Sequence, residues 1–196
     1  FASVTDPVKG RLIKDYGKSG INVAGVSDAA PLEAQVKLFR ELVPNLKKLG
    51  FVYNPGLDNA VSTLENLRKI AGPLGVDIVE SPAPTTNEVI PAAKKLIGKV
   101  EAIYVPNDTT VVAALESIVK IGQETKTPVF TGETGGVERG AVASVGLDYV
   151  DVGRVAGQIV ADVLEGKQVG QLDSVIAYTK LTNFKVVVNK GSAAAM

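Results

Sequence analysis

Five short, mostly apolar runs, separated by segments of helical periodicity, constrain the fold of this chain more than any other feature. The runs lie at residues 49–53, 76–79, 102–105, 128–131 and 141–145. After the first run, Val61, Leu64 and Leu67 recur at helical spacing, and similar patterns follow the next two runs. Continuous apolar strands separated by roughly 10–15 helical residues are typical of a parallel sheet covered on both faces. The sequence therefore predicts an α/β fold with parallel sheets flanked by helices.

The two ends of the chain depart from this repeat. Residues 1–4 and 21–26 read as short extended pieces, and a helix is predicted over residues 32–43. Another helix is predicted over residues 152–163, followed by extended segments at residues 175–178 and 186–188 with no helix between them. Such a pair indicates a return crossing. We predict two lobes, one nearly complete and one represented only by pieces.

Composition excludes several classes of function. The chain has no cysteine and no histidine, which excludes disulfides, Cys/His metal sites, a Ser-His-Asp triad and histidine acid–base catalysis. Lys plus Arg and Asp plus Glu are 21 each, so no basic excess favours nucleic acid. No apolar run approaches the roughly 18 residues of a membrane span. We expect a binding protein without cofactor, metal or catalytic residues, and no nucleic-acid partner.

Four polar segments each follow a predicted strand. They are residues 53–59, 106–110, 131–136 and 146–149. Because the carboxyl ends of parallel strands meet at one edge of a sheet, all four are expected to face the same side, where ligands bind in open α/β sheets.

Each polar segment also has an interpretation that needs no ligand. Asp108 and Thr109 stand directly before helical periodicity, where such side chains cap a helix and stabilise it by about 1 kcal/mol. The sequence around Asn54 is a turn signature, and the glycines near Glu133 suit a loop. Capping and ligand binding remain two alternatives for these residues.

Several segments together carry a resemblance to a known family. They are residues 1–7, 22–28, 42–50, 53–56, 104–108 and 140–153. In this order they resemble the ABC-transporter substrate-binding proteins of the tryptophan/tyrosine-type group, which have the type I periplasmic-binding-protein fold. The resemblance implies two lobes joined by three crossings, with the N-terminal part of the first lobe lacking. Residues 1–46 and 149–166 would belong to the partial first lobe, and residues 47–147 and 175–190 to the second.

The resemblance also implies a function. The chain would be the solute-binding component of an ABC importer, binding an amino acid, aromatic or branched, in the interlobe cleft without chemistry. Its other partner would be a membrane permease. Its location would be periplasmic or extracytoplasmic, with a lipid anchor on the lacking N-terminal part.

An amino-acid ligand needs an anion for its ammonium and donors for its carboxylate. The expected ligand-binding residues are Asp6, Asn54, Asn59, Asp108, Thr109, Thr110, Glu133, Asp148 and Tyr149. Asp108, helped by Glu133 or Asp148, is expected at the ammonium, and helix starts near Asn59 and Thr109 are expected to orient the carboxylate. Tyr53, Tyr149 or Phe1 would flank the side chain, with Asp6 approaching from the first lobe. Ala60 replaces a serine common in the family, which puts the ligand's identity in doubt.

Two rival functions come from other classes. A LacI-like ligand-sensing domain of a transcription regulator shares the fold and would need a DNA-binding segment upstream. A small α/β enzyme is disfavoured because the sequence supplies no nucleophile or metal triad beside carboxylates such as Glu133 and Asp148.

Overall fold

The computed structural model describes residues 1–180 and 184–196, which form two compact units. Unit 1 comprises residues 1–30 and 147–185, and unit 2 comprises residues 31–146 and 186–196. The chain therefore passes from one unit to the other three times, at residues 30–31, 146–147 and 185–186. In the described part of the chain, no helix is both long enough and apolar enough to cross a membrane.

Unit 2 is built on a six-stranded sheet with the strand order β4-β3-β5-β6-β7-β9. Its strands are β3 (Lys48–Tyr53), β4 (Asp77–Pro82), β5 (Ala102–Val105), β6 (Val129–Thr131), β7 (Ala143–Gly146) and β9 (Lys185–Val188). Strand β3 pairs in parallel with β4 and β5, and β5, β6 and β7 continue the parallel pairing. The predicted α/β class is confirmed.

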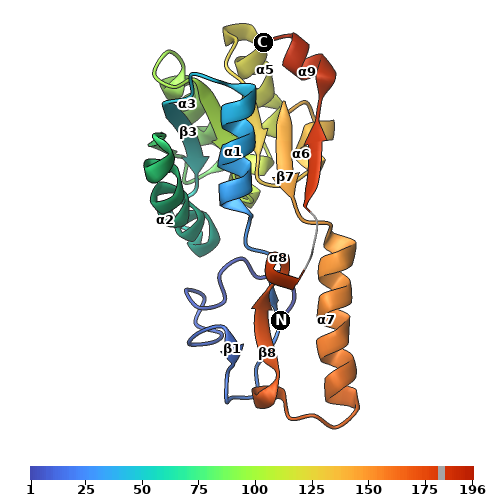
Figure 1. The fold of residues 1–196 in the computed structure, drawn as a ribbon. Coiled ribbons are helices and arrows are strands. Elements are labelled where there is room, and N and C mark those ends of the chain that lie inside the picture. The colour runs from blue at the N-terminus through green and yellow to red at the C-terminus, as the bar shows by residue number, and fades with distance from the viewer. Residues whose placement is uncertain (181–183) are drawn as a thin grey trace. The chain divides into compact units, whose positions relative to one another are not determined.

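Helices cover both faces of this sheet (Figure 1). The helices of unit 2 are α1 (Leu32–Leu42), α2 (Asp58–Ala71), α3 (Thr86–Leu96), α4 (Thr109–Val112), α5 (Leu115–Thr125), α6 (Gly135–Glu138) and α9 (Lys190–Ala194), with a 3₁₀ turn η1 (Gly72–Leu74) after α2. Helices α1 and α2 pack against each other on one face, and α3 packs against α4 and α5 on the other.

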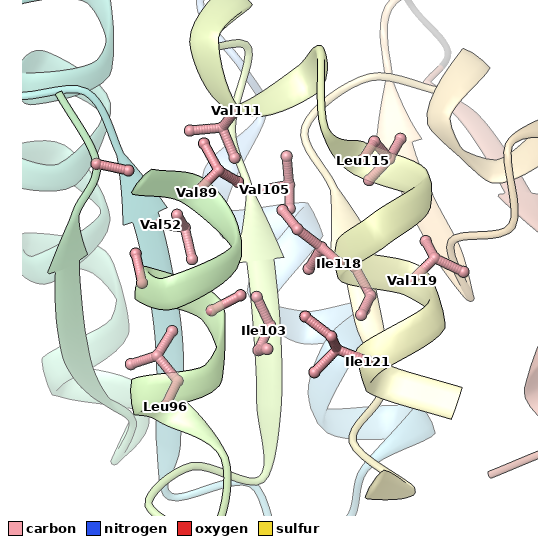
Figure 2. Packing of buried hydrophobic residues seen from close by; sticks show 14 of the residues in the cluster. Val52, Val89, Leu96, Ile103, Val105, Val111, Leu115, Ile118, Val119 and Ile121 are labelled. Atoms are coloured by element: carbon pink, nitrogen blue, oxygen red, sulfur yellow. The ribbon is translucent and has the colours of Figure 1, made fainter. Parts of the chain in front are cut away.

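The two faces of the sheet have different cores because side chains alternate along each strand. From β5, Ile103 and Val105 enter an aliphatic cluster with α3 and α5, which Figure 2 shows from close by. The intervening Tyr104 points to the α1 face and enters an aromatic cluster there. In that cluster, Phe39 of α1 stacks on Phe130 of β6 with ring centroids 4.2 Å apart. Aliphatic packing thus holds α3 and α5, and aromatic packing holds α1.

Close packing of α5 on β6 requires a glycine at position 122. A Cβ atom there would lie 2.6 Å from the carbonyl oxygen of Thr127 and 2.7 Å from a methyl group of Val129. We expect Gly122→Ala to lower the free energy of unfolding by about 2 kcal/mol, since backbone must move. Gly153→Ala is the matched control, because that helical glycine has open space around it. The control should be neutral or stabilising by up to about 1 kcal/mol in urea denaturation; equal effects would contradict the packing argument.

Unit 1 contains a three-stranded sheet with the order β1-β8-β2. Its elements are β1 (Gly17–Lys18), β2 (Val26–Ser27), α7 (Tyr149–Leu164), the 3₁₀ turn η2 (Val169–Gln171), β8 (Asp173–Ile176) and α8 (Ala177–Lys180). Strand β2 runs parallel to β8, and β1 runs antiparallel to it. The extended pieces predicted at residues 1–4 and 21–26 form only a single bridge at Ala2 and the two-residue strand β2.

The observed unit boundaries differ from the predicted lobe boundaries of 1–46, 149–166, 47–147 and 175–190. Residues 31–46 lie in unit 2, because Phe39 carries α1 into the aromatic core of the large sheet. Residues 175–180 lie in unit 1, because β8 pairs with β2. Part of the predicted 175–190 segment, residues 181–183, lies outside the described residues.

Candidate ligand-binding site

The loops after β3 and β5 meet at the carboxylate of Asp108. This residue is the N-cap of α4, and its Oδ1 accepts hydrogen bonds from the backbone N–H groups of Thr110 (2.9 Å) and Val111 (3.2 Å). Its Oδ2 accepts a third bond, 2.6 Å long, from the backbone N–H of Asn54 in the neighbouring loop. The side chain is 0% exposed. Asp108 therefore joins two loops that are 54 residues apart in the sequence.

Two asparagines reinforce this junction. The Asn54 side chain donates to Thr110 Oγ1 (2.9 Å) and accepts from the backbone N–H of Gly56 (2.8 Å), which closes the turn. Asn59, in the first turn of α2, donates to the carbonyl oxygen of Asn107 (2.7 Å). Together with Asp108, these bonds hold the two loops in one arrangement.

The arrangement shows how Asp108 is used inside the protein. The sequence left capping and ligand binding as two alternatives for this residue, with a ligand ammonium expected beside it. Both oxygens accept backbone hydrogen bonds inside the protein. The physical reason is that the backbone N–H of Asn54, at the start of its turn, needs a hydrogen-bond acceptor. Because Asp108 lies 54 residues away, the local sequence around either residue does not predict this bond.

The threonines beside Asp108 are more accessible. Thr109 is exposed and Thr110 is half-buried. Because Thr110 Oγ1 accepts a bond from Asn54, its own hydroxyl proton remains to be donated elsewhere. These hydroxyls are donors suited to a carboxylate at the edge of the sheet.

The loop after β6 reaches the same edge of the sheet. Glu133 is half-buried, and its Oε2 accepts a 2.6 Å bond from the backbone N–H of Gly135 at the start of α6. After α6, Arg139 donates to both carboxylate oxygens of Glu116 and to the carbonyl oxygen of Val112. The hydrogen bonds from Arg139 lower the pKa of Glu116 to about 2. This exposed ion pair links the end of α6 to α4 and α5 and adds little stability by itself.

Tyr53, at the end of β3, was expected to flank a ligand side chain. Its hydroxyl donates to Glu80 on β4 (2.9 Å), and Arg68 of α2 pairs with the same carboxylate (3.0 Å). Hydrogen bonds from Tyr53 and Arg68 lower the pKa of Glu80. The tyrosine hydroxyl is thus committed to the outer strand of the sheet.

In unit 1, a carboxylate that the sequence analysis did not select occupies the end of β2. Asp28 is 8% exposed, and it accepts hydrogen bonds from the hydroxyls of Thr5 (2.9 Å) and Tyr149 (3.1 Å). In the same unit, burial raises the pKa of the Tyr16 hydroxyl. No ion pair to Asp28 occurs among residues 1–180 and 184–196. A buried carboxylate held only by neutral hydroxyls retains acceptor capacity for a cation.

The other predicted residues of unit 1 separate into two roles. Tyr149 joins the Asp28 group through its hydroxyl while its side chain is largely exposed. Asp148 caps α7 by accepting from the backbone N–H of Val150 (2.9 Å), and Asp6 accepts from the backbone N–H of Lys9 (2.9 Å). Asp28 follows the strand β2, just as the four predicted polar segments follow strands. The sequence analysis treated residues 21–26 only as a short extended piece near the N-terminus, so Asp28 was not selected.

A cavity of about 460 Å³ in unit 1 lies elsewhere. Its lining comes from residues 20–22, Val163 and residues 166–171, which precede β2 and β8. It therefore lies at the amino ends of these parallel strands, away from Asp28. Its one charged lining residue, Lys167, pairs with Asp162 at 2.7 Å. Among the described residues, no cluster of three or more His, Cys, Asp or Glu side chains is arranged to hold a metal ion.

A family model and a relative of known name both match this chain over its whole length. The family model described as "ABC transporter substrate binding protein" matches residues 1–196. A tyrosine-binding protein of Clostridioides difficile (strain R20291) is 34% identical over 196 residues, which cover 100% of this chain and 56% of that protein.

Solved structures are also similar over nearly the whole chain. A conserved domain protein from Vibrio cholerae is 41% identical with a TM-score of 0.89, covering 99% of this chain and 64% of that one. An ABC domain from Streptococcus pneumonia in complex with L-Trp is 34% identical with a TM-score of 0.87, covering 98% and 66%. The chain spans less than two thirds of each of these three relatives.

Proposed function

This chain belongs to the family of ABC transporter substrate-binding proteins, and from that premise we propose that it binds an aromatic amino acid, tryptophan or tyrosine, and passes it unchanged to a membrane permease. One observation carries the choice of ligand. Two relatives, each 34% identical over almost the entire chain, are a tyrosine-binding protein and a domain in complex with L-Trp. The proposal includes an extracytoplasmic location, where an importer collects its solute.

Asp28 is our candidate for the ammonium group. It is the buried carboxylate of unit 1 that neutral hydroxyls hold in place, with two acceptor positions already used by Thr5 and Tyr149. A carboxylate has about four lone-pair positions, so an ammonium can bind beside these donors. Desolvated opposite charges attract strongly when hydrogen-bonded, which favours an amino acid over a neutral solute. The exposed Tyr149 side chain lies next to this carboxylate and offers a surface for an aromatic side chain.

The loops of unit 2, taken by themselves, carry hydroxyl donors of the kind that bind a carboxylate. Thr109 and Thr110 supply hydroxyl donors, and Asn54 and Asn59 hold the loops that carry them. Asp108 acts indirectly, by fixing the start of α4 and the backbone of Asn54. Glu133, which was expected to help at the ammonium, accepts a hydrogen bond from the backbone N–H of Gly135 with one of its oxygens.

The roles of three acids support the proposal of binding without chemistry. Asp108, Asp148 and Glu133 each accept hydrogen bonds from backbone N–H groups at the start of a helix. Each of these carboxylates holds the start of a helix, a structural role that needs no chemistry. The proposal therefore excludes turnover of the ligand.

Titration calorimetry with a panel of amino acids tests this function. We expect L-Trp or L-Tyr to bind in the micromolar range or tighter, and L-Arg and L-Glu to bind at least tenfold more weakly, because a second charge would be desolvated without a partner. Indole-3-propionate, which lacks the ammonium, is the matched control ligand and should bind more weakly than L-Trp. Equal affinity for L-Trp and L-Glu would contradict the proposal.

A further inference from the structure

A glutamine in the core of unit 2 makes three long-range hydrogen bonds. Gln35 lies in α1 and is 0% exposed. Its Nε2 donates to the carbonyl oxygens of Gly132 (3.0 Å) and Val145 (2.7 Å), and its Oε1 accepts from the hydroxyl of Tyr104 (2.7 Å). All the hydrogen-bonding atoms of this amide thus have partners 69 to 110 residues away.

The two carbonyl groups lie near the carboxyl ends of β6 and β7, where the loop that carries Glu133 begins and where the chain leaves unit 2. Gly132 opens the loop that carries Glu133, directly after β6. Val145 lies near the end of β7, one residue before Gly146, where the chain leaves unit 2. Gln35 itself lies one helical turn after the crossing at residues 30–31, and its backbone N–H donates to the carbonyl oxygen of Pro31. One side chain therefore links the start of α1, just after one crossing, to the end of β7, just before another, and to the loop after β6.

The third partner fixes the orientation of the amide. Tyr104 is fully buried between Phe39 and Phe51, with ring centroids 5.5 Å and 5.7 Å away. Burial raises the pKa of its hydroxyl, which therefore remains a neutral donor. Because the hydroxyl donates to Oε1, Nε2 must face the two carbonyl groups. An apolar side chain of the same volume would fill this space but would leave the backbone oxygens of Gly132 and Val145 without this donor.

We propose that Gln35 is a positioning residue, which fastens the loop after β6 and the crossing after β7 to the start of α1. Its effect on ligand affinity rests on the proposed function, whereas its effect on the loop does not. In this proposal the side-chain amide of Gln35, in the core, holds the loop after β6 by donating to Gly132.

Hydrogen exchange measured by mass spectrometry on the ligand-free protein tests this role. Gln35→Met keeps the volume and removes both donors; we expect amides in residues 132–137 and 145–148 to exchange about tenfold faster than in the wild type. Tyr104→Phe is the matched control, because it removes the third bond and keeps the bonds to Gly132 and Val145. Those segments should then exchange within about twofold of the wild type.

A double variant keeps the test valid if Gln35→Met does not fold. Gln35→Met with Tyr104→Phe also removes the hydroxyl that would be left unpaired, which restores part of the stability while the donors remain absent. Faster exchange confined to the two segments supports the positioning role. Unchanged exchange there, or an equal rise across β3, β5 and β6, would overturn it.

The affinity for L-Trp provides the second readout. Gln35→Met should bind L-Trp more weakly than Tyr104→Phe does, by about tenfold. Equal affinities of the two variants would overturn the effect on the site. If the wild type binds neither L-Trp nor L-Tyr, the proposed function fails, and the exchange comparison still decides the role of Gln35.

Discussion

Asp108→Ala is expected to lower the free energy of unfolding by about 4 kcal/mol, well beyond the loss of an ordinary helix cap. The wild-type carboxylate is 0% exposed and accepts three backbone hydrogen bonds, two from the start of α4 and one from Asn54. Alanine would leave all three N–H groups without their acceptor. Urea denaturation followed by circular dichroism measures the change.

Two variants separate the parts of this effect. Asp108→Asn keeps a capping oxygen but places an N–H donor against the backbone N–H of Asn54, so it should cost about 2 kcal/mol. Asp148→Ala removes a cap that accepts a backbone hydrogen bond from Val150 and should cost about 1 kcal/mol. If Asp108→Ala were no more destabilising than Asp148→Ala, the junction between the two loops would not be a source of stability.

Asp28→Asn is expected to weaken binding of L-Trp or L-Tyr roughly 100-fold, since truncating one partner of a buried charge pair costs about 2–5 kcal/mol. Asparagine keeps the shape of the side chain and one acceptor oxygen for Thr5 or Tyr149. The main property that this substitution removes is therefore the negative charge. Calorimetry at neutral pH gives the affinity, and urea denaturation checks that the variant remains folded.

A matched residue and a matched ligand isolate the ammonium contact. Asp173→Asn changes an exposed carboxylate of unit 1 at the start of β8 and should alter the affinity less than about threefold, as expected for an exposed charge. Indole-3-propionate has no ammonium, so Asp28→Asn should not weaken its binding. A similar loss for both ligands would show that Asp28 acts on the fold of the site and not on the ammonium.

The central sheet was predictable because its signal is local. The predicted strand at residues 102–105 coincides with β5, and that at 49–53 differs from β3 by one residue. Both are continuous apolar runs bounded by turn residues. The carboxyl ends of β3, β5 and β6 also share one edge, as the parallel pairing required. The fourth polar segment, residues 146–149, instead spans the boundary between the units.

The remaining features depend on contacts that no local pattern encodes. Helix α1 was assigned to the first lobe by its place in the sequence, whereas Phe39 and Gln35 bind it to the second sheet. The sequence offered Asp108 both as a helix cap and as a ligand-binding residue. The structure shows the cap, together with a bond from Asn54, 54 residues away, to its second oxygen. Asp28 was missed because β2 is only two residues long and draws its partner, β8, from the far end of the chain.

Native mass spectrometry of the purified protein, with the bound ligand released and identified, tests the proposed function most directly. We predict that the protein carries, or takes up from a mixture of amino acids, one molecule of unmodified L-tryptophan or L-tyrosine. Retention of a sugar or nucleotide, or release of a chemically altered amino acid, would contradict the account of a transport protein that binds aromatic amino acids.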